Sequence, residues 1–452
     1  MNKILLINPV YNSGTIPKNI PLSKIASGLM LCNYEVDAID FVNPDCENRD
    51  FSFFQKAEES FVNSILNKVC DYDIVYITTG TGSELKPYPL FPRVKTIAKA
   101  IKSNSNAKIY VGGALINLYV LIYKLKKEQI CDGVIDKLIV GNEYNSFLSS
   151  VVKTHWPEST APSWDIWKSN LYPTYKSVQY HVGCPFSCDF CFEGMIFDPR
   201  SDRTNLDDFI SSIADDENII IEDSVILSYH DFDAIIERLS SKKVRFAAYA
   251  RISEIVNNPD KVIKMHSAGC NSMILGIETL NLDLLKEHNK EIVDSQTRLA
   301  LDILKDIGVD IQGCFMLGFP KDTLRNMERT IEFAIKEQLK GYRWHIYQPN
   351  FSNDTSGLYI NDGNSAINAS DHLQVQLNVP DNCLSAVMET QPELGKLDEH
   401  FMFRSKPFIN SKCFEHIGYR DGFSYQDIKD LIDKLFPQEW ILNEEVLYKD
   451  LF

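Results

Sequence analysis

The sequence predicts an α/β protein in three parts: a doubly wound parallel sheet, an open parallel barrel and a small α+β C-terminal domain. Short apolar runs alternate with helical patterns from residue 3 to about residue 152, which is typical of parallel sheets covered by helices. The same alternation resumes from about residue 178 to residue 347 and fits about six strand–helix repeats. From about Phe351 polar and glycine clusters take over, which favours loop-rich structure.

The composition is that of an ordinary globular protein. The chain has 452 residues, of which 44% are hydrophobic and 24% charged, and these values exclude a disordered chain or a coiled coil. At this length we expect two or three domains. The net charge of −16 argues against binding of long nucleic acids, which needs a basic surface. No apolar run reaches the ~18 residues of a membrane helix, and we expect a cytoplasmic protein that binds no membrane.

The first sheet is expected to contain five strands separated by helices. KILLIN, at residues 3–8, is fully apolar and ends in Asn-Pro, as suits a buried parallel strand followed by a loop. The other strands are expected at residues 35–40, 73–78, 108–113 and 137–141. Helical spacing of apolar residues predicts the intervening helices at about residues 22–31, 54–69, 92–102 and 144–152.

Ligands of such sheets bind outside the carboxyl ends of the strands. The segments there offer hydroxyls, backbone N–H groups and close backbone approach, as a large polar cofactor needs. The alternative is that the glycines only make turns. No GxGxxG follows the first strand, which argues against a dinucleotide. The candidate residues at this edge are Thr78, Thr79, Ser83, Gly112 and Gly113.

Three of the eleven cysteines form a CxxxCxxC motif: Cys184, Cys188 and Cys191. In a reducing compartment cysteines serve as core thiols or ligands more often than as disulfides. Three thiolates at this spacing can bind three irons of a [4Fe–4S] cluster and leave the fourth iron open. A structural zinc site is the alternative, but it usually needs four ligands in two separated pairs, and no matching fourth ligand follows.

The motif resembles the signature of the radical S-adenosylmethionine (radical SAM) superfamily, including the aromatic Phe190 before the last cysteine. The resemblance implies that the open iron chelates S-adenosylmethionine (SAM). One electron then cleaves SAM to methionine and a 5′-deoxyadenosyl radical. It also implies an external one-electron reductant of the flavodoxin or ferredoxin type. Phe190 is expected near the adenine; its alternative role is packing.

Further segments resemble the same superfamily in matching order, over about 170 residues. The resemblance places Glu222 and Asp223, at a strand end, near the methionine part of SAM. Arg251 ends the next strand and can pair with a carboxylate or form a surface salt bridge. These positions fall at carboxyl ends of predicted barrel strands, where parallel barrels carry their sites.

Two later segments complete the resemblance. Met273-Ile-Leu-Gly-Ile-Glu278 matches the superfamily's GIE pattern, which implies that Glu278 accepts hydrogen bonds from the ribose or the amino group of SAM. The stretch from Ile311 to Pro320 resembles the strand and turn that close the cofactor pocket, with Gly318 shaping the turn.

A doubly wound Rossmann-like domain ahead of this motif resembles the cobalamin-binding subgroup of the superfamily. Matching stretches include NP after the first strand, PLSKIASGL, VDAID, YVGG and the degenerate VGNE turn. The first histidine is His155, at the very end of this domain, so the domain lacks the DxHxxG motif that supplies cobalt with a histidine, as do many members of the subgroup. We therefore predict a cobalamin-binding-like domain over residues 1–155, a partial (β/α)6 radical SAM barrel over 165–348, and a small α+β substrate or lid domain over 349–452.

The C-terminal hundred residues bear on the substrate. From Phe351 to Phe452 there are 17 acidic and 8 basic residues, the opposite of an RNA-binding module, so we expect a small-molecule or peptide substrate. Cys383 and Cys413 are candidate hydrogen-atom donors, because radical peptide epimerases use a cysteine in this way. The alternative for both is an inert buried thiol.

The main hypothesis is a radical SAM enzyme that uses cobalamin to methylate an unactivated carbon. The second is a radical SAM epimerase or rearranging enzyme with a vestigial cobalamin domain and a cysteine donor in the tail. The third, a non-catalytic iron–sulfur or cobalamin sensor, is disfavoured because the SAM-side motifs accompany the cluster cysteines.

Overall fold

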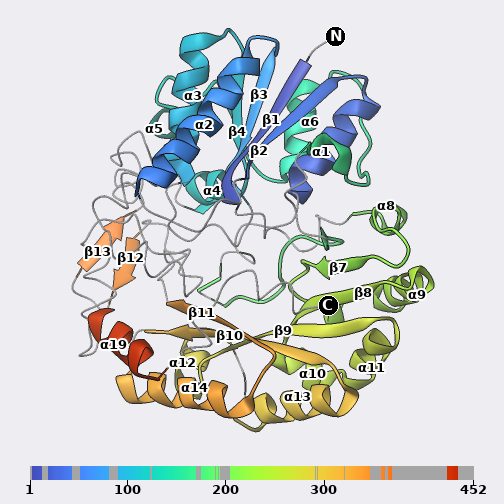
Figure 1. Ribbon diagram of the computed structural model, residues 1–452, viewed down its shortest axis with the longest axis vertical. Helices are drawn as coiled ribbons and strands as arrows, with labels where there is room; N and C mark the ends of the chain where they lie inside the picture. The colour runs from blue at the N-terminus through green and yellow to red at the C-terminus, as the bar shows by residue number, and fades with distance from the viewer. Residues whose placement is uncertain are drawn as a thin grey trace.

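The computed structural model describes most of the chain up to residue 346 and three short segments beyond it. The described residues are 3–12, 19–42, 51–80, 90–122, 125–168, 175–188, 190–191, 193, 204–290, 292, 294–319, 321–346, 358–361, 365–368 and 425–435. Within them two parallel sheets lie one above the other (Figure 1). The predicted α/β fold class is confirmed.

The first sheet has five parallel strands in the order β2-β1-β3-β4-β5. This is the flavodoxin-like order of doubly wound folds. The strands are β1 (Lys3–Asn12), β2 (Glu35–Val42), β3 (Ile74–Thr78), β4 (Lys108–Gly112) and β5 (Lys137–Ile139). The five predicted strands are therefore all present.

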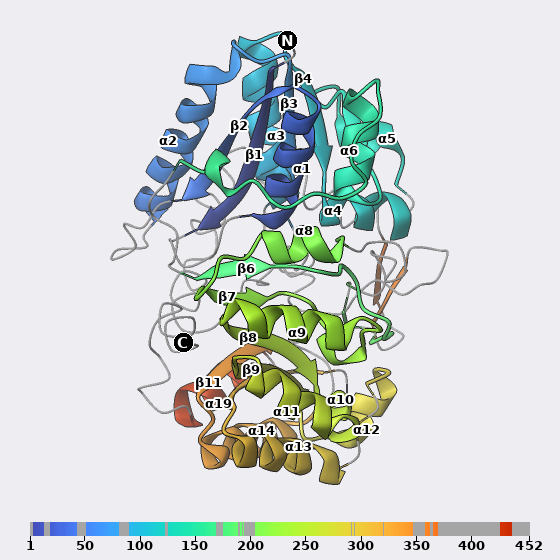
Figure 2. The same ribbon diagram turned by 90° about the vertical axis from the view of Figure 1, so that its right-hand side faces the viewer.

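Helices cover both faces of this sheet (Figure 2). One buried cluster joins the sheet to α2, α3, α4 and α5, and a second joins its other face to α1 and α6. The helices are α1 (Ile20–Leu31), α2 (Phe51–Val69), α3 (Leu90–Asn104), α4 (Ala114–Asn117), α5 (Lys127–Cys131) and α6 (Glu143–Val151), with a π-helical turn over Leu118–Ile122 after α4.

Side-chain caps explain where two predicted helices begin. The Asn19 side chain accepts a hydrogen bond from the Leu22 amide, and Asn142 does the same for Asn145. An N-cap of this kind satisfies an amide that has no partner within the helix. Because of these caps, the two helices start one or two residues earlier than the apolar spacing alone predicts.

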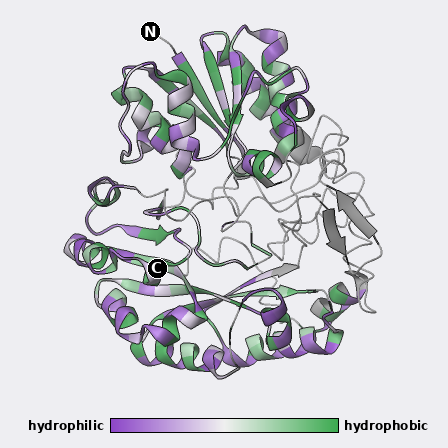
Figure 3. Ribbon diagram, turned by 180° about the vertical axis from the view of Figure 1, so that it is seen from behind, coloured by the Kyte–Doolittle hydropathy of each residue, from purple (hydrophilic) through white to green (hydrophobic). Residues whose placement is uncertain are grey.

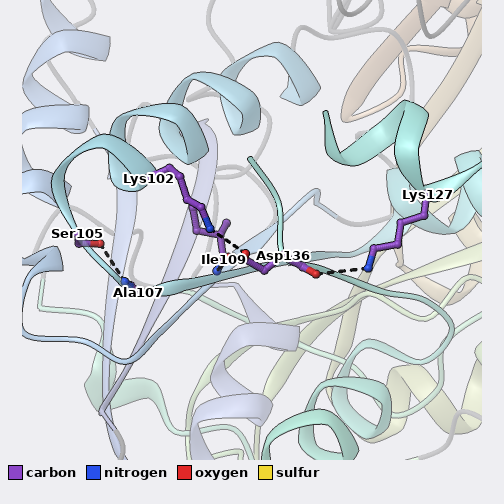
Figure 4. A network of polar contacts seen from close by, with 6 residues as sticks. All are labelled: Lys102, Ser105, Ala107, Ile109, Lys127 and Asp136. Carbon is purple, nitrogen blue, oxygen red and sulfur yellow. Dashed lines mark hydrogen bonds and ion pairs between the residues drawn. The ribbon is translucent and has the colours of Figure 1, made fainter. Parts of the chain in front are cut away.

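Asp136 fixes the start of the edge strand β5 against β4 (Figure 4). Its carboxylate accepts hydrogen bonds from the Ile109 amide at 2.8 Å and from Lys102 Nζ at 2.8 Å. Lys127 Nζ lies 3.4 Å from its backbone oxygen. Burial alone would raise the pKa of Asp136, but the Ile109 amide and Lys102 hold it below its ordinary value.

The second sheet has six parallel strands in the order β11-β10-β9-β8-β7-β6. It curves into an open barrel (Figure 1). The strands are β6 (Lys176–Val178), β7 (Asn218–Ile221), β8 (Arg245–Arg251), β9 (Cys270–Glu278), β10 (Asp310–Leu317) and β11 (Gly341–Ile346). The predicted number of strand–helix repeats is confirmed by these six strands.

The barrel helices lie on the outer face of the sheet, and hydrophilic and hydrophobic residues alternate along their ribbons (Figure 3). Their apolar faces and the strands share one large buried cluster, as amphipathic covering helices require. The helices are α8 (Leu206–Ser211), α9 (Phe232–Lys242), α10 (Ile252–Asn257), α11 (Pro259–Ser267), α12 (Leu282–Glu287), α13 (Asp294–Ile307) and α14 (Leu324–Glu337).

Beyond the barrel, the described residues form a β-hairpin and a helix. The hairpin pairs β12 (Leu358–Asn361) with β13 (Ser365–Asn368) in antiparallel fashion. The helix α19 (Tyr425–Leu435) buries Ile428 completely in the barrel core cluster. Strand and helix agree with the predicted α+β composition of this part, and the predicted domain boundaries stay predictions.

The two sheets are joined through α1 and the segment that links them. Trp167 Nε1 donates a hydrogen bond to Ser23 Oγ at 2.8 Å, and the Ser27 and Thr160 hydroxyls lie 2.8 Å apart. Lys24 Nζ donates to Thr204 Oγ1, just before α8 of the barrel. The carboxyl ends of the first sheet's strands point toward the barrel (Figure 1). No helix among the described residues is long and apolar enough to span a bilayer.

Replacing Asp136 with alanine should loosen the pairing of β5 with β4. The Ile109 amide loses its charged acceptor, a loss of about 1 kcal/mol at a half-exposed position, and local opening should become about fivefold more frequent. Hydrogen exchange at residues 109–112 and 136–139 measures this. The control Lys102→Met removes only the exposed ion pair and should change exchange by less than twofold, roughly. Equal effects of both variants would contradict the assigned role of the amide bond.

Candidate active site

The three motif cysteines lie in the loop that follows β6. All three are free thiols. The Cys191 amide donates a hydrogen bond to the Cys188 carbonyl at 3.1 Å, which folds the loop back on itself. Cys188 is buried, and both it and Cys191 pack against Phe190, Met316 and Phe319. Two of the three thiols therefore lie in an apolar cluster near the end of β10.

This donor set fits an iron–sulfur cluster. Burial raises the pKa of Cys184 to about 11 and that of Cys191 to about 12, and each thiol lies within electrostatic reach of the others. Metal ions reverse this balance, because a coordinated thiol loses its proton. Among the described side chains, no three His, Cys, Asp or Glu groups surround a single ion. A cubic cluster needs no such grouping, because each thiolate binds a different iron.

Phe190 belongs to an aromatic group beside the thiols. Its ring centroid lies 5.8 Å from that of Phe319, which lies 5.1 Å from that of His288. Gly318 has φ +79°, a backbone region that favours glycine, and this turn brings Phe319 back over the strand. The structure thus shows the packing role of Phe190, and its expected contact with adenine stays a prediction.

Glu278 ends β9 in a buried ion pair. Lys290 Nζ lies 2.6 Å from Glu278 Oε1, and both side chains are at most a tenth exposed. Glu278 has φ +64°, and a residue other than glycine in this region stores backbone strain of a kind that clusters at functional sites. A Cβ on Gly276 would lie 2.6 Å from Lys290 Nζ, so the glycine of the GIE pattern makes room for the pair.

Glu222 and Asp223, which are adjacent, have different partners. Asp223 is fully buried, and its two oxygens accept the Tyr180 and His181 amides at 3.0 and 3.1 Å. Burial raises its pKa to about 7, although these hydrogen bonds act against that rise. Glu222 accepts from Ser177 Oγ at 2.6 Å. Asp223 therefore anchors the start of the cysteine loop, and the expected contacts of both carboxylates with methionine stay predictions.

Arg251 touches a motif cysteine. Its Nη1 lies 3.1 Å from Cys188 Sγ, and its guanidinium lies 3.8 Å from the centroid of the Phe186 ring. Its backbone amide donates to Glu254 Oε2 at 3.2 Å, at the start of α10. The side chain is thus directed at the thiol and the cysteine loop, and its expected pairing with a carboxylate stays a prediction.

At the edge of the first sheet, the predicted residues hydrogen-bond to one another. Thr79 Oγ1 donates to the Gly112 carbonyl at 2.8 Å, and the Gly80 amide donates to Thr78 Oγ1 at 3.3 Å. A Cβ on Gly113 would lie 2.9 Å from Thr79 Oγ1. These contacts fix a compact backbone edge, and its contact with a cofactor stays a prediction.

Comparison with known proteins identifies the second domain. Residues 178–334 match the family model of the radical SAM superfamily. This part of the chain is a radical SAM domain. The match implies a [4Fe–4S] cluster and SAM. Cys184, Cys188 and Cys191 are the thiols of this domain that have the CxxxCxxC spacing. The resemblance predicted from the CxxxCxxC motif is thus confirmed.

Two curated relatives are named as methyltransferases. An uncharacterized methyltransferase of Pyrococcus horikoshii is 24% identical over 77% of this chain and 81% of its own length. Bacteriochlorophyllide d C-8(2)-methyltransferase of Chlorobaculum tepidum is 22% identical over 62% of this chain and 65% of its own.

Two solved structures share the fold of both sheets. The radical SAM methyltransferase TsrM of Kitasatospora setae, solved with cobalamin and a [4Fe–4S] cluster, covers 77% of this chain and 75% of its own at TM-score 0.55 and 13% identity. The cobalamin-dependent radical enzyme OxsB covers 91% of this chain and 63% of its own at TM-score 0.54 and 13% identity.

Several site residues were not predicted from sequence. Lys290 lies in the polar run Glu287-His-Asn-Lys-Glu291, a pattern typical of a solvated surface. Phe186 lies between the first two cysteines, but this position alone does not predict its contact with Arg251. The candidates Ser83, Cys383 and Cys413 lie outside the described residues.

Replacing any one of Cys184, Cys188 and Cys191 with alanine should abolish cluster binding. A cluster with only two protein thiolates loses a ligand that water replaces poorly, so iron should fall from about four per chain to below one. Anaerobic reconstitution with iron and sulfide analysis measures this. Cys70→Ala removes an exposed thiol and should leave the iron content unchanged. Full iron content in all three variants would contradict the assignment.

Asp223→Asn should release the cluster faster than Glu222→Gln does. An asparagine offers one acceptor to two amides, so one of them is left unsatisfied at a cost of about 1–3 kcal/mol. Glutamine can still accept from Ser177. Iron loss to a chelator should therefore be about fivefold faster or more in Asp223→Asn, and close to the unsubstituted rate in Glu222→Gln. Equal rates in the two variants would refute the anchoring role.

Proposed function

We propose that this enzyme is a cobalamin-dependent radical SAM methyltransferase that methylates an unactivated carbon of a small molecule or peptide. The observation that carries the proposal is the order of its two sheets. A flavodoxin-like domain precedes the radical SAM barrel, and its carboxyl edge is turned toward the barrel (Figure 1). The relatives named as methyltransferases and the solved cobalamin-dependent enzymes with the same fold support it.

Different residues of the described part serve the cluster and SAM. When bound, the cluster and SAM supply a radical that abstracts hydrogen, and cobalamin supplies the methyl group that replaces it. The three cysteines hold the cluster. At the end of β9, the Glu278 carboxylate suits the amino group of SAM, and the Lys290 ammonium suits its carboxylate. The apolar side chains of Phe190, Met316 and Phe319 shield Cys188 from water.

The edge of the first sheet suits a corrinoid that receives no histidine. No histidine precedes His155, so the strands and loops before it would offer cobalt no imidazole ligand. Asn117 links α4 to the turn after β5, donating to the Gly141 carbonyl at 2.9 Å and accepting from the Gly141 amide at 2.8 Å. These paired bonds keep the edge rigid, which lowers the ordering cost of binding a large ligand.

The proposal can be tested without knowing the substrate. Protein prepared without oxygen in the presence of cobalamin should retain about one corrinoid per chain. With SAM carrying a deuterated methyl group and a strong reductant, the bound corrinoid should gain the label and S-adenosylhomocysteine should form. Mass spectrometry of the corrinoid and of the nucleoside products measures both.

Cys188→Ala provides the matched control. It should still bind cobalamin, because the cysteine loop belongs to the barrel, but it should form no 5′-deoxyadenosine. A protein that cleaves SAM yet retains no corrinoid would overturn the methyl-transfer proposal and leave the radical SAM assignment intact.

A further inference from the structure

Arg251 is placed to act on the cluster itself. Its Nη1 lies 3.1 Å from Cys188 Sγ, within the range of a charge-assisted hydrogen bond to sulfur. The guanidinium therefore lies directly against one of the three motif thiols.

Three features of the structure hold the Arg251 side chain in this position. Phe186 lies between the first two cysteines, and the guanidinium carbon of Arg251 lies 3.8 Å from its ring centroid, a cation–π contact. The Arg251 amide bonds to Glu254, a buried carboxylate that also accepts from Ser228 Oγ. The residue is the last of β8, so the barrel backbone sets where the side chain begins.

A cation at this distance changes the energy of electron transfer. Reduction adds one negative charge to the cluster and its thiolates, and a nearby positive charge stabilises the reduced form. The contact involves the buried Cys188, where water screens the interaction weakly. Hydrogen bonds to the sulfurs and local charge are among the properties that set iron–sulfur reduction potentials.

We infer that Arg251 is a positioning residue that raises the reduction potential of the cluster through Cys188, with Phe186 holding its guanidinium against the cysteine loop. One electron passes from the external reductant to the cluster, and no bond forms or breaks in this step. The inference rests on cluster binding by the three cysteines, and it is independent of cobalamin and methyl transfer.

The test is a potentiometric titration of the reconstituted protein without SAM or cobalamin, with dithionite as reductant and the signal of the reduced cluster followed by electron paramagnetic resonance. At a fixed solution potential, Arg251→Met should lower the ratio of reduced to oxidised cluster at least tenfold, which is about 59 mV for one electron. Arg251→Gln keeps a neutral donor, so its ratio should fall less. Phe186→Leu should shift the ratio in the same direction by a smaller factor.

Arg245→Met is the matched control. It removes the same charge from the other, exposed end of β8 and should leave the ratio unchanged. Because a guanidinium stays protonated, the offset between the unsubstituted protein and Arg251→Met should be constant from about pH 6 to about pH 9.

The outcomes separate the possible failures. If the unsubstituted protein binds no iron, the cluster assignment fails. If Arg251→Met has the potential of the unsubstituted protein but binds SAM more weakly, Arg251 serves the SAM carboxylate and the inference is wrong. If Arg251→Met loses the cluster, Arg251→Gln decides it, since the ratio is measured per cluster present. An unchanged ratio in Arg251→Gln would overturn the inference.

Discussion

The site depends on one constraint of covered parallel sheets, which leave only their strand ends free for chemistry. Helices occupy both faces of the first sheet and the outer face of the second. The strands bury apolar side chains along most of their length, so polar groups appear where the strands stop. In the barrel, Glu222, Arg251, Glu278 and Gly318 all lie at or just after a strand's carboxyl end. The cysteine loop leaves β6 at this same edge.

Several carboxylates gathered at this edge have defined partners that offset the cost of removing them from water. Asp223 is held by two backbone amides, Glu254 by an amide and a hydroxyl, and Glu278 by an ammonium group. A buried polar group without a partner costs more than a hydrogen bond gains. Asp223 thereby stiffens the start of the loop that carries the thiols, and such rigidity suits a site whose charge changes during a reaction.

The sequence predicted the elements of both sheets well, because apolar runs and helical periodicity are local signals. The five strands of the first sheet lie where KILLIN and the later apolar runs placed them, and only the ends moved by a few residues. The spacing of the three motif thiols is a chemical signature, and their binding of the cluster stays a prediction. The sequence could not predict partners distant in the chain. Lys290 meets Glu278 only because α12 returns to the end of β9, and Arg251 meets Cys188 across 63 residues.

The link between the two domains reaches the cysteine loop through a short chain of contacts. Lys24, on α1, bonds to Thr204, whose amide donates to the Tyr180 carbonyl at 2.7 Å. The Tyr180 amide in turn donates to Asp223 at 3.0 Å, and the charge of Lys24 lowers the pKa of that carboxyl against the larger effect of burial. Hydrogen bonds thus connect α1 of the first domain to Asp223, which anchors the cysteine loop. A shift of α1 relative to the barrel would break the Lys24 bond and leave Asp223 with less positive charge nearby. The docking of the first domain and the order of the cysteine loop are therefore linked through this buried carboxylate.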